Sequence, residues 1–115
     1  MHKEKQKYTV LNKNFQFQNV YRKGLSYISP LVVAYVLPRA TGQIRYGITT
    51  SKKIGCAVER NRARRVIKAA LYDLLPKIDG GYDLVFVARK ATVVSKSTKV
   101  YSELYKHFNR AGIVE

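Results

Sequence analysis

The alternation of hydrophobic and polar residues along the chain predicts three strands. Residues 31–37 form a continuous apolar run rich in valine, and because the run is too short for a typical helix it predicts a buried strand. Residues 44–51 alternate between apolar and polar positions and contain β-branched residues, so we expect a second strand that pairs with the first. Residues 83–89, which follow a turn at two consecutive glycines, predict the third strand.

Apolar residues at helical spacing predict three helices. The first is short, can be capped by Asn12 or Asn14, and ends at Gly24. The second covers residues 57–75 and stops before a proline. The last begins near residue 95 or 97 and gathers its aromatic side chains on one face. The order helix, strands, helix, strand, helix is typical of an α+β or α/β sandwich.

The length of the chain and its cysteine content limit the class of protein. The 115 residues suffice for one compact domain, so we expect a single domain over residues 1–115, with residues 1–11 as a basic, partly extended arm. No run approaches the roughly 18 apolar residues of a membrane span, and the N-terminus lacks the apolar segment of a secretory signal. The single cysteine, Cys56, cannot form an internal disulfide, and we expect it to be a small buried or half-buried filler. These features predict a cytoplasmic protein.

The net charge narrows the choice of partner. Lys and Arg number 22 against 7 Asp and Glu, which gives a formal net charge of +15 at pH 7. A folded domain of this size repels itself at that charge unless a polyanion is its partner. Nucleic acid is the first candidate and an anionic membrane surface is the second. The membrane surface is disfavoured because the basic helix carries small side chains opposite its charges and has no aromatic belt.

Residues 52–68 concentrate the basic side chains on the expected second helix and the loop before it. On a helical wheel the apolar residues fall opposite the cations, so one face docks on the sheet and the other presents an array of arginines. Guanidinium groups match phosphate oxygens, and an array held in place loses little side-chain entropy on binding. The candidate nucleic-acid-binding residues are Lys52, Lys53, Arg60, Asn61, Arg62, Arg64, Arg65 and Lys68.

The alternative interpretation of this array is a solvated helix face without a partner. Such faces usually mix charges of both signs, whereas residues 52–68 contain one acid, Glu59. Asn61 can also donate and accept hydrogen bonds at a base edge or a ribose hydroxyl. Lys52 and Lys53 can converge on phosphate together with the N–H groups of the helix N-terminus. Contact with nucleic acid is therefore the favoured interpretation.

The same segment resembles the signature of the bacterial ribonuclease P protein subunit. The matching residues are SKKIG at 51–55, AV at 57–58, RNR at 60–62 and RR at 64–65. The resemblance continues through residues 17–24, 32–37, 45–48 and 83–90, which is nearly the whole chain. Cys56 departs from the family, which usually has Asn at this position.

The resemblance implies both a fold and a function. The fold is α+β and ribosomal-protein-like, with three helices packed on a small, mostly antiparallel sheet of four strands and a left-handed βαβ crossover. Family members bind a catalytic RNA and the 5′ leader of precursor tRNA, and they support the removal of the leader by that RNA. The implied cofactor is Mg²⁺ held mainly by the RNA. The implied partners are the catalytic RNA and precursor tRNA, with the protein a monomer within the ribonucleoprotein.

By the same resemblance, Phe17, Tyr21 and Tyr35 match the aromatic positions of a groove for the single-stranded leader. Aromatic rings that stack on unpaired bases hold RNA without strict sequence choice. The alternative for each ring is an ordinary place in the hydrophobic core, and for Tyr21 both alternatives remain open. Phe15 departs from the helical stripe that carries the other aromatic residues.

The residues favour a protein that does not cut RNA by itself. A protein nuclease needs clustered carboxylates for metal ions, or histidines with a lysine, but the acidic residues are scattered among different elements. His107 lies near the end of the last helix, where a cation favours the helix dipole, so we expect a capping role rather than catalysis. Two alternatives are a structural ribosomal protein, which would not need the aromatic groove, and an autonomous nuclease.

Overall fold

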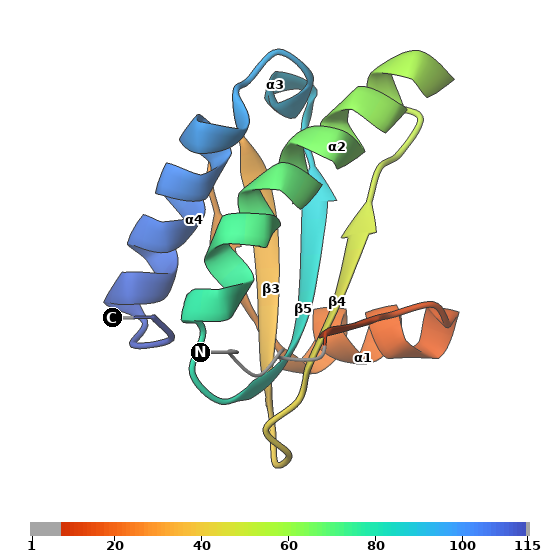
Figure 1. Ribbon diagram of the computed structural model, residues 1–115. Coiled ribbons are helices and arrows are strands. Elements are labelled where there is room, and N and C mark those ends of the chain that lie inside the picture. Colours follow the sequence, from red (N-terminus) through yellow and green to blue (C-terminus); the bar gives the residue numbers. More distant parts are fainter. Residues whose placement is uncertain (1–7, 115) are drawn as a thin grey trace, which may run out of the picture.

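The computed structural model describes residues 8–114, which form a mixed sheet with helices on both of its faces (Figure 1). The strands are β1 (Tyr8–Val10), β2 (Leu25–Ile28), β3 (Val32–Arg39), β4 (Ile44–Thr49) and β5 (Gly81–Ala88). Their spatial order is β1-β4-β5-β3-β2. β4 pairs in parallel with β1 and β5, whereas β3 pairs antiparallel with β2 and β5. The α+β class is confirmed, but the expected sheet of four mostly antiparallel strands is wrong, because residues 8–114 form a sheet of five strands whose pairing is mixed.

The helices divide between the two faces of this sheet. They are α1 (Asn14–Lys23), α2 (Ala57–Leu74), the 3₁₀ turn η1 (Leu75–Lys77), α3 (Lys90–Val93) and α4 (Ser97–Arg110). α2 and α4 lie side by side on one face, and α1 covers part of the other (Figure 1). The three expected helices correspond to α1, α2 and α4, while the short α3 and η1 were not predicted. η1 continues the chain through Pro76, since proline is tolerated at the start of a helical turn.

The strand at residues 44–49 does not pair with the strand at 32–39, contrary to the sequence-based expectation. β5 lies between them, with Ile44 opposite Tyr82 and Val32 opposite Ala88. The reason is the α2 crossover, which brings the chain back to the sheet parallel to β4. In Figure 1, α2 crosses in front of the upward-running β4 and β5, and β5 lies to the left of β4, so the crossover has the rare left hand that the resemblance implied.

Successive side chains along each strand point to opposite faces of the sheet. Leu84 and Phe86 of β5 belong to the larger hydrophobic core beneath α2 and α4, whereas Val85 belongs to a smaller core beneath α1. The apolar stripe predicted for the second helix is confirmed, because its residues pack into the larger core. The buried residues of α2 are Ala63, Ile67, Ala70, Leu71 and Leu74. Burial of this stripe fixes the orientation of α2 and leaves its opposite face in solvent.

The start of α1 differs from the expectation that Asn12 or Asn14 caps it. The N-cap residue is Lys13, and the side-chain oxygen of Gln16 accepts hydrogen bonds from the backbone N–H groups of Asn12 and Lys13, at 3.0 and 3.1 Å. A glutamine at the third helical position can reach back to the cap in this way, which makes an asparagine cap unnecessary. The helix ends before Gly24, as predicted.

Two edge strands were not predicted as strands. β1 falls within the expected basic arm, of which residues 1–7 lie outside the described residues, and it pairs with β4 from Tyr8 to Val10. β2 follows α1 directly and pairs with β3. Both strands are too short to show a periodic pattern. Within residues 8–114, no helix is both long and apolar enough to cross a membrane.

Candidate nucleic-acid interface

The eight residues predicted to bind nucleic acid, seven cations and Asn61, gather on α2 and in the loop before it. Arg60 and Arg64 are half-buried at the border between the polar face and the core, where they approach neighbouring backbone and side-chain groups. The other six project into solvent. These exposed residues are Lys52, Lys53, Asn61, Arg62, Arg65 and Lys68. The structure therefore places all eight predicted residues between the turn that precedes α2 and Lys68, just past the middle of that helix.

Two of these arginines are held in place by hydrogen bonds. Nη1 of Arg60 donates to the carbonyl oxygen of Gly55 at 2.7 Å, and Nη2 of Arg64 donates to Oγ1 of Thr50 at 3.1 Å. A guanidinium has five N–H donors, so one such bond leaves most donors available to a ligand. The bonds restrict the side chains before any ligand arrives, which lowers the entropy that binding must remove.

The loop that carries the lysines is a compact turn. Ile54 is buried and its N–H donates to the carbonyl oxygen of Ser51, while the N–H of Gly55 donates to the carbonyl oxygen of Lys52. These contacts anchor one side of the turn in the core. Lys52 and Lys53 consequently point away from the core, at the point where β4 ends and α2 begins.

Glu59 caps the N-terminus of α2. Its Oε1 accepts a hydrogen bond from the N–H of Cys56, the N-cap residue, at 3.0 Å. The carboxylate lies so close to Gly55 that a Cβ there would come within 1.9 Å of it, and Gly55 has a φ of +143°, which favours glycine. Cys56 is exposed, so the expectation of a buried or half-buried filler is wrong. A residue at a helix N-cap lies outside the buried stripe, and here the glutamate supplies the cap.

The three predicted aromatic residues lie on the opposite face of the sheet, around α1. The rings of Tyr21 on α1 and Tyr35 on β3 meet edge to face, with centroids 4.9 Å apart. The ring of Phe17 rests on Gly47 of β4, where a Cβ would come within 2.5 Å of the ring. All three are half-buried and pack against the smaller core, so each combines a packed side with an exposed side. Phe15 is 68% exposed and lies apart from that core.

The sequence reasoning missed an ion cluster on the same face. Asp83, which is 3% exposed, accepts two hydrogen bonds from Arg45, at 2.8 and 2.7 Å, and lies 3.5 Å from Nη1 of Arg39. The hydrogen bonds to Asp83 raise the pKa of the Arg45 guanidinium. Arg45 and Asp83 are register partners on β4 and β5, and both face α1. The sequence alone indicates this ion pair only once that strand pairing is known. The cluster connects β3, β4 and β5, and its two arginines compensate the negative charge of the buried Asp83 carboxylate.

The described residues do not offer a metal site. Between Tyr8 and Val114 there is no group of three His, Cys, Asp or Glu side chains that could hold a metal ion. Mg²⁺ takes oxygen ligands in octahedral geometry, and residues 8–114 provide no cluster of three such side chains that could enclose it without help from a partner. His107 lies in the last turn of α4, half-buried, with its ring centroid 6.0 Å from that of Tyr27.

Comparisons with known proteins give one consistent result. The family model described as Ribonuclease P matches residues 6–112. The chain is 36% identical over 105 residues to the "Ribonuclease P protein component" of Clostridium kluyveri, covering 90% of this chain and 94% of that protein. It is 44% identical over 80 residues to the protein of that name from Clostridioides difficile, covering 69% and 70%.

Solved structures show the same fold. The RNase P protein of Staphylococcus aureus superposes with a TM-score of 0.77 at 27% identity, covering 92% of this chain and 97% of that one. The RNase P protein of Thermotoga maritima gives a TM-score of 0.71 at 22% identity, covering 82% and 89%. Because its sequence identity is only 22%, the similarity to the Thermotoga maritima protein shows a shared fold and nothing more.

Proposed function

The chain belongs to the ribonuclease P protein family, and we therefore propose that it is the protein subunit of a ribonucleoprotein that removes the 5′ leader from precursor tRNA. The coarse assignment, a role in tRNA processing, comes with the family. The finer one has three parts: α2 binds the catalytic RNA, the α1 face binds the leader, and the RNA performs the cleavage.

The observation that carries the first part is the arginine array of α2. Its exposed members, Arg62 and Arg65, lie beside Arg60 and Arg64, whose side chains are already oriented by hydrogen bonds. A set of guanidinium groups on a fixed helix, two of them held by hydrogen bonds, suits a folded RNA, whose phosphates are themselves fixed in space. Asn61 lies among them and supplies a donor and an acceptor for a base edge or a 2′-hydroxyl.

The second part rests on the half-buried rings of Phe17, Tyr21 and Tyr35. Rings that are packed on one side and exposed on the other stay in place and can still stack on an unpaired base. β4 lies between the two surfaces, since Phe17 rests on its Gly47 and Arg64 bonds to Thr50 just beyond its end. One RNA assembly can therefore contact both surfaces around β4.

The third part concerns the chemistry. Hydrolysis of a phosphodiester by a metal-activated water needs ligands that hold the metal beside the scissile phosphate. Because the donor set of residues 8–114 does not form such a site, we assign Mg²⁺ to the RNA subunit. The protein supplies charge and positioning. The family match favours this function over that of a structural ribosomal protein.

The test is reconstitution with defined components. Purified protein, the cognate catalytic RNA, and the two together are incubated with precursor tRNA and Mg²⁺, and 5′-leader release is measured. We expect no release by protein alone and faster release, at lower Mg²⁺, by the complex than by RNA alone. Magnesium-dependent cleavage by RNA-free protein would refute the division of labour, and no effect of the protein on the RNA would refute the function.

A further inference from the structure

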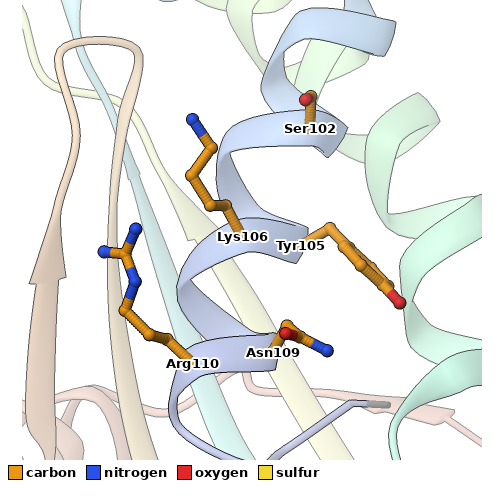
Figure 2. A pocket seen from close by; sticks show the side chains of 5 residues that line it. All are labelled: Ser102, Tyr105, Lys106, Asn109 and Arg110. Atoms are coloured by element: carbon orange, nitrogen blue, oxygen red, sulfur yellow. The ribbon is translucent and has the colours of Figure 1, made fainter.

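The outer face of α4 carries a surface pocket that the proposed function does not use. Figure 2 shows that Tyr105 and Asn109 project to one side of the helix, whereas Lys106 and Arg110 project to the other. Tyr105 is half-buried and the other four lining residues are exposed. The lining residues are Ser102, Tyr105, Lys106, Asn109 and Arg110.

A second cluster adjoins this pocket through Tyr105. The rings of Tyr101 and Tyr105 are stacked, with centroids 5.8 Å apart and planes inclined by 27°. Nζ of Lys77, from η1, lies 5.0 and 5.7 Å from the two centroids and donates a hydrogen bond to the Tyr101 hydroxyl. This hydrogen bond raises the pKa of the Lys77 ammonium group. The cation and the two rings hold one another in a fixed arrangement.

We propose that this face of α4 is a separate binding site for single-stranded RNA, with Tyr105 as the base contact and Lys106 and Arg110 as the phosphate contacts. Stacked aromatic rings beside cations are the combination that binds unpaired nucleotides without strict sequence choice. Asn109 adds hydrogen-bonding groups for a base edge or a ribose hydroxyl. The inference rests on the proposed function only in taking RNA to be the natural partner.

Charge complementarity favours RNA as the occupant. The pocket lining contains two cations and no acid, and the one acid on α4, Glu103, is half-buried. An acidic protein segment would match the cations but offers no base to stack on the half-buried ring of Tyr105. Binding of an acidic peptide is therefore an outcome that the experiment must distinguish.

The site is distinct from the aromatic surface around α1. α4 lies on the same side of the sheet as α2 (Figure 1). Phe17, Tyr21 and Tyr35 pack against the smaller core on the other side of the sheet. An RNA strand on α4 is consequently a different segment from a leader on the α1 face. Because α2 and α4 are packed side by side, such a segment can belong to the RNA that binds the arginine array.

The first experiment measures affinity for a short probe. A fluorescein-labelled oligouridylate of twelve nucleotides is titrated with the full chain carrying Arg62→Ala and Arg65→Ala, which reduces binding at α2. In this background we expect Lys106→Glu to weaken binding at least about threefold and Tyr105→Ala at least about fivefold, the lower end of the range for one stacked base. Lys96→Glu is the matched control, because Lys96 is exposed at the other end of α4, outside the pocket, and changes the charge equally.

Tyr105→Phe separates binding from packing. It retains the ring and should bind the probe within about twofold of the parent chain, whereas Tyr105→Ala should not. If Lys106→Glu and Lys96→Glu weaken binding equally, the effect is one of net charge and the proposal fails. It also fails if a polyglutamate peptide competes with the oligouridylate at equal concentration.

The second experiment locates the contact without relying on affinity. An oligouridylate with 5-iodouridine is crosslinked to the unmodified chain by light, and the adducts are mapped by mass spectrometry. We expect an adduct on the peptide that contains Tyr105, absent in Tyr105→Ala. Adducts confined to peptides of α1 and β3 would overturn this proposal and leave the proposed function intact. Failure of the proposed function would instead show in the reconstituted cleavage assay.

Discussion

Tyr21 and Tyr35 meet edge to face across the contact between α1 and β3, with ring centroids 4.9 Å apart and planes inclined by 75°. This geometry is favourable for two aromatic quadrupoles and fixes the position of α1 on the sheet. It leaves each ring half-buried, so the pair serves packing and remains accessible to an unpaired base.

This relationship gives a prediction for Tyr35→Ala in the reconstituted complex. Loss of one stacking contact should reduce the affinity for precursor tRNA by a factor between about 5 and 150, because a stacked base contributes about 1–3 kcal/mol. The affinity for mature tRNA, which lacks the leader, should stay nearly unchanged. Equilibrium binding of both tRNAs is the measurement.

Tyr35→Phe is the control for that experiment, since it keeps the ring and should keep the preference for the precursor. A melting curve on each variant detects a purely structural effect. If Tyr35→Ala lowers both affinities equally together with the melting temperature, the ring acts in the core and not on the leader.

The arginine array predicts a change in salt dependence. Each phosphate contact contributes about 0.7–0.9 to the slope of log affinity against log salt, through release of counterions. Arg62→Ala with Arg65→Ala should therefore lower the slope for the catalytic RNA by roughly 1.5, without unfolding the protein, because both side chains are exposed.

Lys96→Ala with Lys99→Ala removes the same charge from the first part of α4 and serves as the control. Its slope should change less than that of the α2 variant. Equal slopes for the two double variants would mean that the protein binds through its net charge and not through the α2 face.

Gly55 predicts a local effect on stability. In Gly55→Ala the added Cβ would meet the Glu59 carboxylate, and the alanine would have to adopt a φ of +143°, which is unfavourable for it. The substitution should therefore displace the glutamate that caps α2 and lower the free energy of unfolding by about 1–2 kcal/mol. Urea denaturation measures this. Gly42→Ala is the control, because no atom lies within 4 Å of its added Cβ, and a loss of equal size there would contradict the explanation.

Loss of the buried Asp83 carboxylate should reduce stability more than the change at Gly55. Asp83→Asn leaves Arg39 and Arg45, whose side chains are 22% and 26% exposed, without their counter-charge. The free energy of unfolding should fall by about 3 kcal/mol, the lower end for breaking a buried ion pair, because both arginines retain some access to water. Thermal and urea unfolding measure the loss. Asp79→Asn, at an exposed acid, should change stability little, and similar losses for the two variants would exclude the ion cluster as the cause.

The amino-acid sequence by itself determined α2 and its two faces. The apolar residues from Ala63 to Leu74 recur at helical spacing, and this local pattern is sufficient to place the arginines opposite the core. The residue pattern at 51–65 also pointed to the family, which the comparisons confirmed. Both inferences depend on residues close together in the chain.

The tertiary structure alone decided which strands are neighbours. Residues 32–39 and 44–49 are consecutive and look like a hairpin, but β5 lies between them because the α2 crossover returns the chain to the middle of the sheet. Strand pairing joins residues far apart in sequence, and nothing in the local pattern of a buried strand specifies its partner.

The same reason applies to single contacts. Arg45 with Asp83 and Lys77 with Tyr101 meet only because the fold joins segments 38 and 24 residues apart. The sequence supplied the charges and the rings, while the arrangement of the elements decided which of them pack against other groups and which lie at the surface. Local periodicity encodes how a segment divides between core and solvent, and long-range packing selects its partners.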